Sequence, residues 1–195
     1  METVQQYKVD KEPQETLAMD PMKFILWLFL VSIIMLFASQ TSAYLVRRAE
    51  GNWLEFEMPK IFWYSTVVLL FSSMAMQWAY FSAKKDQFKQ LKIAISITFV
   101  LGLVFLAMQF EGWKQLVSVN VYFVGNPSGS FFYVFTGLHG FHIISGLIVL
   151  FFSWMAAFRL NVHAKNLRRI QICVTYWHFL DILWLYLFVF LLTFN

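Results

Sequence analysis

Five long apolar stretches, separated by short polar segments, dominate the pattern of the chain. They cover residues 24–46, 61–83, 93–110, 131–158 and 173–194, and Asp181 is the one formally charged side chain within them. As helices that rise about 1.5 Å per residue, they suit a hydrocarbon layer about 30 Å thick. Backbone amides in lipid must be satisfied within each segment, and the stretches lack the alternation typical of barrel strands. The pattern therefore predicts an all-α integral membrane protein, a bundle of five transmembrane helices.

Composition agrees with a membrane protein and excludes a water-soluble domain. Hydrophobic residues make up 59% of the 195 residues and charged residues only 13%, whereas soluble domains are about a quarter charged. Residues 1–20 are predicted to form a polar tail, and residues 21–195 a single membrane domain. A single cysteine, Cys173, rules out an internal disulfide, c-type haem attachment and a thiolate-bridged copper pair. Any redox metal would therefore need other ligands.

The distribution of basic residues predicts the orientation of the bundle. If the five spans alternate in direction, eleven Lys and Arg residues lie on one side and four on the other. The richer side is expected in the cytoplasm, which places the N-terminus inside and the C-terminus in the periplasm. The connection 111–130 is expected on the periplasmic side. It contains a turn-forming cluster at residues 125–129 that should start the fourth helix. The excess of Lys and Arg at the helix ends is expected to set the topology and to bind anionic lipid, so no nucleic-acid partner is expected.

Polar side chains recur every three residues in the last two apolar stretches. They are Thr136, His139 and His142 in the fourth stretch and Thr175, His178 and Asp181 in the fifth. This spacing places each set on one side of its helix, and Gly140 and Gly146 nearby let another helix approach closely. Imidazole and carboxylate groups could bind a metal ion or a b-type haem. However, the predicted spans separate His142 from Asp181 by about 8 Å in height, so we expect packing within the chain and contacts between subunits instead.

Other polar and aromatic residues are assigned simpler roles. Hydroxyl and amide side chains in the first three stretches are expected to close helix contacts. Most of the tryptophans lie near the ends of the stretches, where indole prefers the lipid interface, whereas Trp184 is deeper and should pack within the protein. Four basic residues after the fourth stretch are predicted to hold phospholipid headgroups. They are Arg159, Lys165, Arg168 and Arg169.

Two motifs in the last two stretches resemble the cytochrome c oxidase subunit III family, the third subunit of the haem–copper oxidases. Residues 131–142 read FFYVFTGLHGFH, similar to the family's TGxHGxH helix, and residues 176–184 read YWHFLDILW, similar to its YWHFxDxxW helix. Weaker similarities extend over most of the chain, and five spans match the short bacterial form. One departure lies in the first span, where the family often has a buried glutamate after a serine and here Ile33 follows Ser32.

The resemblance implies a subunit without catalytic, cofactor-binding or metal-binding residues of its own. In the family, subunits I and II hold the haems and copper, while subunit III packs against subunit I, holds lipids and helps to sustain proton uptake. The expected function is that of a non-redox subunit of a proton-pumping terminal oxidase of the cytochrome c oxidase type, in a prokaryotic cytoplasmic membrane. Two alternatives stay open: subunit III of a quinol oxidase or a nitric-oxide-reductase-associated homologue, and a stand-alone b-type haem protein.

Overall fold

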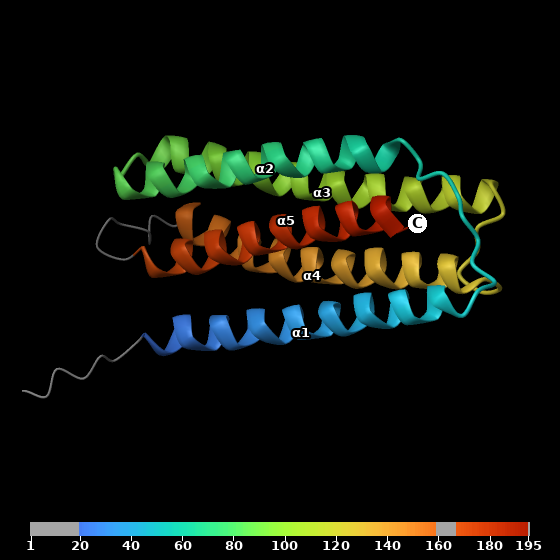
Figure 1. The fold of residues 1–195 in the computed structure, drawn as a ribbon. Coiled ribbons are helices and arrows are strands. Elements are labelled where there is room, and N and C mark those ends of the chain that lie inside the picture. The colour runs from blue at the N-terminus through green and yellow to red at the C-terminus, as the bar shows by residue number, and fades with distance from the viewer. Residues whose placement is uncertain (1–19, 159–166, 195) are drawn as a thin grey trace, which may run out of the picture.

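The chain folds into long helices that run side by side (Figure 1). The computed structural model describes residues 20–158 and 167–194, and of residues 156–158 it describes the backbone alone. The described residues form five helices, which are α1 (Pro21–Ala49), α2 (Ile61–Lys84), α3 (Phe88–Ser118), α4 (Pro127–Phe158) and α5 (Arg168–Phe194). The all-α class and the five long apolar helices that the sequence predicts are therefore confirmed.

Local sequence determines where two of the helices begin. The carboxylate of Asp20 caps α1 by accepting a hydrogen bond from the backbone N–H of Met22 at 3.1 Å. The side-chain oxygen of Asn126 does the same for Ser128 at the start of α4, at 3.0 Å. A proline follows each capping residue, at a helical position that needs no donor. The predicted turn cluster at residues 125–129 thus starts the fourth helix, as expected.

The helices form a bundle in which consecutive helices run in opposite directions (Figure 1). α2 and α3 make an antiparallel pair, with α2 packed on α5 and α3 packed on α4, while α1 contacts mainly α4 and α5. One end of the bundle holds the start of α1 and the turn between α2 and α3, and the other end holds the end of α5. At that other end, the Asn126 side chain bonds the backbone of Asn52 and Leu54, so it joins the two connecting segments there.

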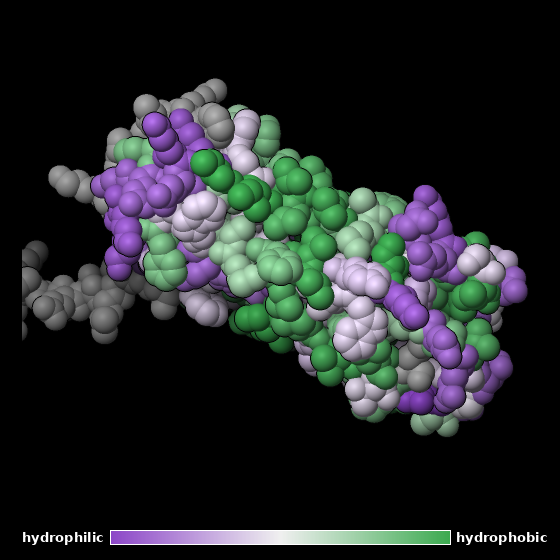
Figure 2. Space-filling view, turned by 90° about the horizontal axis from the view of Figure 1, so that it is seen from above, coloured by the Kyte–Doolittle hydropathy of each residue, from purple (hydrophilic) through white to green (hydrophobic). Residues whose placement is uncertain are grey.

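The surface of the bundle has the polarity expected of a membrane protein. A broad hydrophobic band crosses the middle of the molecule, and hydrophilic residues gather at both ends (Figure 2). Each of the five helices in the described residues is long and apolar enough to span a membrane. Large apolar side chains such as Met35 on α1 and Ile182 on α5 are 68% and 66% exposed, so they would meet lipid or a partner protein.

The helices are longer than the apolar stretches that predict them. α3 continues to Ser118 and α4 begins at Pro127, so the connection predicted over residues 111–130 is reduced to residues 119–126. Hydropathy marks the part of a helix that can lie in lipid, whereas polar residues can continue the same helix into water. Glu111 and Lys114 do so on α3, where they form an ion pair at 3.0 Å along the helix.

Two glycines allow α3 and α4 to approach α5 closely. A Cβ added at Gly146 on α4 would lie 2.9 Å from the side chain of Leu180 on α5. One added at Gly102 on α3 would lie 2.9 Å from the ring of Trp177, also on α5. At Gly140, by contrast, the nearest atom would be 3.9 Å away, which is ordinary contact. The predicted close approach is therefore seen at Gly146 and not, within this chain, at Gly140.

Candidate functional site within the membrane helices

Tryptophan side chains join the helices through hydrogen bonds to hydroxyl groups. The indole N–H groups of Trp113, Trp154, Trp177 and Trp184 donate to Thr136, Ser96, Ser72 and Thr66, respectively, at distances of 2.9 to 3.2 Å. These bonds join α3 to α4 and α2 to α5. A buried indole needs an acceptor, and a hydroxyl on the next helix supplies one. Thr136, which the spacing singled out, is thus a contact between α3 and α4.

Three tryptophans are exposed and two are buried, a difference that the sequence predicted only in part. Trp27, Trp63 and Trp78 are between 42% and 56% exposed, as expected for side chains at a lipid interface. Trp184 is buried, as predicted, but so is Trp177, which lies close to the start of its apolar stretch. The two buried side chains lie seven residues apart, two helical turns, and both bond to α2. Their burial follows from the face of α5 that they occupy, because that face packs against α2, α3 and α4.

His139 lies in the interior of the bundle among aromatic rings. Its side chain is fully buried, and its ring centroid is 5.0 Å from that of Trp184 and 5.9 Å from that of Phe105. Neither ring nitrogen has a hydrogen-bond partner among the described residues. Within the described chain, His139 therefore packs as an aromatic side chain, whereas the sequence favoured hydrogen-bonded contacts.

His142 faces α1, and the residues around it connect three helices. Its Nδ1–H donates to the carbonyl oxygen of Leu138 at 2.7 Å, and its ring lies 5.8 Å from that of Phe37 on α1. One turn further along α4, the hydroxyl of Ser145 lies 2.5 Å from the hydroxyl of Tyr176 on α5. These side chains hold α1, α4 and α5 together.

His178 is the centre of a polar cluster between α2 and α5. Its Nδ1 lies 2.7 Å from the hydroxyl oxygen of Ser73, and its Nε2 lies 3.0 Å from the amide oxygen of Gln77. Both ring nitrogens of His178 are thus within hydrogen-bond distance of side chains on α2. Asp181 is one turn along α5, with its Oδ2 3.8 Å from Nδ1 of His178. We call these four residues the His178 cluster.

The His178 cluster lines a groove on the outside of the bundle, which we call the α2–α5 groove. Its volume is about 340 Å³, and the cluster shares its lining with the more exposed apolar side chains of Leu70, Met74 and Ile182. The side chain of Asp181 is only 5% exposed, and neither carboxylate oxygen has a hydrogen-bond partner among the described residues. The groove is therefore a place where the bundle leaves a polar group unsatisfied within a membrane helix.

The predicted polar sets of α4 and α5 lie at similar heights along the bundle, but His142 and Asp181 point to different neighbouring helices. Ring, hydroxyl and glycine contacts pair residues 139–146 of α4 with residues 176–184 of α5. The height difference predicted between His142 and Asp181 is thus too large, because the helices extend beyond the apolar limits that defined their midpoints. His142 contacts α1, whereas Asp181 lies beside α2. Within the described ranges, no three His, Cys, Asp or Glu side chains are grouped so that they could hold a metal ion.

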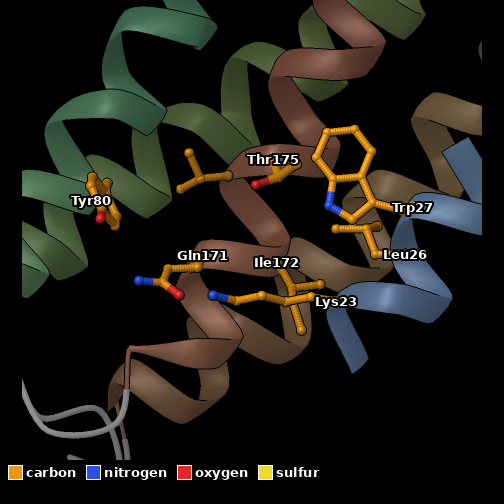
Figure 3. A pocket seen from close by; sticks show the side chains of 8 residues that line it. Lys23, Leu26, Trp27, Tyr80, Gln171, Ile172 and Thr175 are labelled. Carbon is orange, nitrogen blue, oxygen red and sulfur yellow. The ribbon is translucent and has the colours of Figure 1, made fainter. Parts of the chain in front are cut away.

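A second cavity lies at the end of the bundle where α1 and α5 begin. Its volume is about 290 Å³, and Thr175, which the sequence predicted as a contact residue, lines it together with Lys23, Trp27, Tyr80 and Gln171. Figure 3 shows Lys23 and Trp27 coming from α1, Tyr80 from α2, and Gln171 and Thr175 from α5. A cation and an amide beside apolar walls suit an amphipathic molecule with an anionic headgroup.

Two of the four predicted headgroup residues belong to the described part of the chain. Arg168 forms an ion pair with Asp20 at 2.7 Å, which links the start of α5 to the start of α1. Arg169 is exposed at the same end of the bundle. Arg159 and Lys165 lie outside the described residues. Arg168 therefore takes part in an internal contact between helices, and Arg169 faces outward.

The sequence identified the polar residues on α4 and α5 but not the residues on neighbouring helices that they contact. Three-residue spacing singled out Thr136 and His178. Their partners were predicted only in general terms: Trp113 as a residue at the lipid interface, and Ser73 and Gln77 as residues in helix contacts. One signal was present, since Ser73 and Gln77 are four residues apart and so share a face of α2. The pairing itself depends on how the helices are aligned, which no local spacing contains.

Comparisons with known proteins identify the family. Residues 52–195 match the family model of cytochrome c oxidase subunit III. Cytochrome c oxidase subunit 3 of a Bacillus species (strain PS3) is 30% identical, over 83% of this chain and 80% of the relative. The probable cytochrome c oxidase subunit 3 of Nocardia farcinica is 34% identical, over 84% of this chain and 82% of the relative. The cytochrome bo(3) ubiquinol oxidase subunit 3 of Pseudomonas aeruginosa is 31% identical, over 85% and 81%.

The five apolar helices and these similarities define the class of protein, a multi-pass membrane subunit of a haem–copper oxidase. The chain belongs to the cytochrome c oxidase subunit III family. The matched region covers α2 to α5 and includes both motifs on which the resemblance rested. The predicted family is confirmed, and membership implies partners in an oxidase complex.

Proposed function

We propose that the chain is a non-redox subunit of a proton-pumping terminal oxidase of the cytochrome c oxidase type, where it stabilises the large catalytic subunit I during aerobic respiration. The family match over residues 52–195 carries the proposal. Two of the three relatives described above are named as subunit 3 of a cytochrome c oxidase, one of them as probable. The haems and copper would then be bound by subunits I and II, with no cofactor bound by this chain.

The polar side chains of the last two helices would serve packing and subunit contacts. The residues concerned are Thr136, His139, His142, Thr175, His178 and Asp181. The hydrogen bonds of Thr136 and His178 to neighbouring helices support the packing role. The positions of Thr175 and Asp181 in outward cavities support a role toward lipid or a partner. At the position of the family's glutamate, the buried side chain of Ile33 is aliphatic and can carry no proton.

The proposed orientation has the N-terminus in the cytoplasm and the C-terminus in the periplasm, in a prokaryotic cytoplasmic membrane. At the end that holds the start of α1, the described basic residues are Lys23, Lys84, Lys85, Lys89, Lys92, Arg168 and Arg169. At the opposite end they are Arg47, Arg48, Lys60 and Lys114. The excess at the first end supports a cytoplasmic location for it. Residues 21–195 would form one membrane domain behind the polar tail of residues 1–20, and residues 1–19 lie outside the described part.

Bound phospholipid is the proposed occupant of the cavity at the basic end. Lys23 contributes a cation to the cavity, and Trp27 contributes an apolar wall. Exposed Arg169 belongs to the same end of the bundle. An anionic headgroup in the cavity would gain from Lys23, since a juxtamembrane Lys or Arg attracts anionic lipid by about 1 kcal/mol.

Purification of the native membrane complex through a tag on this chain tests the proposed function. A haem-bearing large subunit should copurify, and the chain expressed alone should show no Soret band stoichiometric with the polypeptide. A stoichiometric Soret band from the chain alone would contradict the proposal and favour a stand-alone b-type haem protein. Loss of this chain should shorten the time over which the oxidase sustains turnover.

A quinol oxidase is the second candidate, because the similarity to the ubiquinol oxidase subunit 3 of Pseudomonas aeruginosa is as extensive as the others. The copurified subunit II distinguishes the two: a two-cysteine copper site indicates cytochrome c as donor, and its absence from that subunit indicates quinol. A complex that reduces nitric oxide in place of oxygen would favour the nitric-oxide-reductase-associated alternative.

A further inference from the structure

The α2–α5 groove combines an apolar rim with a polar floor near the middle of a membrane helix. On the rim, Leu70, Met74 and Ile182 are 42%, 58% and 66% exposed. On the floor lies Asp181, the central residue of the 27-residue helix α5. At 1.5 Å per residue, about 20 Å separates it from either end of the helix. The groove therefore presents a carboxylate at the depth where it is most costly to leave without a partner.

The polar groups nearest to Asp181 are engaged with other side chains. Nδ1 of His178 lies 2.7 Å from the hydroxyl of Ser73 and Nε2 lies 3.0 Å from the amide oxygen of Gln77, whereas Nδ1 is 3.8 Å from Oδ2 of Asp181, beyond hydrogen-bond distance. Neither oxygen of Asp181 has a hydrogen-bond partner among the described residues, although the side chain is only 5% exposed. Burying an acidic side chain without a donor is unfavourable, so the bundle needs a donor from outside at this point.

Lipid cannot meet this requirement. A headgroup stays at the membrane surface, about 15 Å from the middle of a 30 Å hydrocarbon layer, and acyl chains carry no donor. A second copy of this chain that docked symmetrically through the same groove would place the same acid against it. A transmembrane helix of another protein can bring an N–H or O–H group to this depth and cover the apolar rim at the same time.

We infer that the α2–α5 groove docks a transmembrane helix of the oxidase's large subunit, which donates a hydrogen bond to Asp181 from a hydroxyl, amide, indole or guanidinium group. The inference rests on the proposed function, since it takes the large subunit as the partner. Met74 and Ile182 come from different helices and contact the docked helix on its two sides. Asp181 fixes the depth of docking, because a shift by one helical turn leaves both donor and acceptor unpaired.

Photocrosslinking within the intact oxidase complex tests which face is docked. Photoreactive p-benzoylphenylalanine is placed at Met74 in the groove, and at Met35 as a matched control, since both are exposed methionines near the middle of their helices. Illumination of the Met74 variant should give a covalent adduct with the large subunit, identified by mass spectrometry. The Met35 variant should give little of this adduct.

The outcomes separate the docking surface from the proposed function. Adducts from Met74 with lipid only, or with a second copy of this chain, in a complex that retains the large subunit would overturn the groove as the docking surface. A large-subunit adduct from Met35 with none from Met74 would do the same. If no large subunit copurifies with the tagged chain, the proposed function itself fails, and the inference fails with it.

Substitution of Asp181 tests the hydrogen bond. Asp181→Leu should increase the loss of this chain from the complex during detergent washing by roughly three- to twenty-fold, as expected for one hydrogen bond between membrane helices. Asp181→Asn keeps a carbonyl acceptor and should retain most of the chain. Asp181→Leu should not lower the thermal stability of the isolated chain, because the carboxylate has no hydrogen-bond partner within the described residues and its nearest contact with His178 is 3.8 Å long. If Asp181→Leu destabilised the isolated chain but the complex retained the chain normally, Asp181 would have a role within the chain, and the hydrogen bond to the docked helix would be refuted.

Discussion

Replacement of Gly146 by alanine should destabilise the bundle, whereas the same replacement at Gly140 should not. Both glycines lie in α4, and both variants gain the same helix propensity, about 0.8–1 kcal/mol on soluble-peptide scales. An added Cβ at Gly146 would lie 2.9 Å from Leu180 and 3.4 Å from the ring of Trp177. At Gly140 the nearest atom, of Leu106, would be 3.9 Å away. The pair of variants therefore differs mainly in the space available.

The expected difference follows from how firmly the neighbours of Gly146 are held. Carbon atoms prefer separations of about 3.5–4.0 Å, so Leu180 would have to move by about 0.6 Å. Leu180 and Trp177 are 0% and 1% exposed, and the indole N–H of Trp177 donates to Ser72 at 3.2 Å. Overpacking such a site costs about 1–3 kcal/mol. Since helix propensity cancels, the two alanine variants should differ in free energy of unfolding by about 1–3 kcal/mol.

The assay is unfolding of the purified chain in mixed micelles by titration with SDS, followed by circular dichroism and tryptophan fluorescence. Gly102→Ala serves as a second test, because an added Cβ there would lie 2.9 Å from both Leu147 and Trp177. It should also be less stable than Gly140→Ala. If Gly146→Ala proves as stable as Gly140→Ala, the close approach of α4 and α5 at this point is refuted.

Other contacts can be tested one at a time. Trp184→Phe and Thr66→Val should show a coupling of about 0.6–1.7 kcal/mol in a double-mutant cycle, and strictly additive effects would mean that their 3.0 Å bond contributes nothing. Because the native cysteine is buried, an impermeant maleimide applied to spheroplasts should label Gly125→Cys and not Lys85→Cys, and the opposite labelling would reverse the proposed orientation. Lys23→Ala should reduce the anionic phospholipid retained in native mass spectrometry, whereas unchanged lipid would argue against the cavity in Figure 3.

The sequence by itself determined the helices, one helix start and the family. Long uncharged stretches can satisfy their backbone in lipid only as helices, so their positions predicted all five. The turn-forming cluster at residues 125–129 predicted the start of the fourth helix, and the structure shows that Asn126 caps α4 with a proline directly after it. Spacing of three residues placed His178 and Asp181 on one face of α5, and the structure shows both in one groove. These features depend on local chemistry, which a single chain segment contains.

Only the tertiary structure decided which side chains meet. His178 lies 105 and 101 residues from its partners Ser73 and Gln77, and their contact depends on how α5 is aligned with α2. Hydropathy carries no information on this alignment, because lipid and protein core are equally apolar to a leucine. For the same reason, sequence could not separate the buried Trp177 from the exposed Trp78. Alignment is set by many packing contacts at once, and these turn Asp181 toward an outward groove and His139 into the aromatic interior.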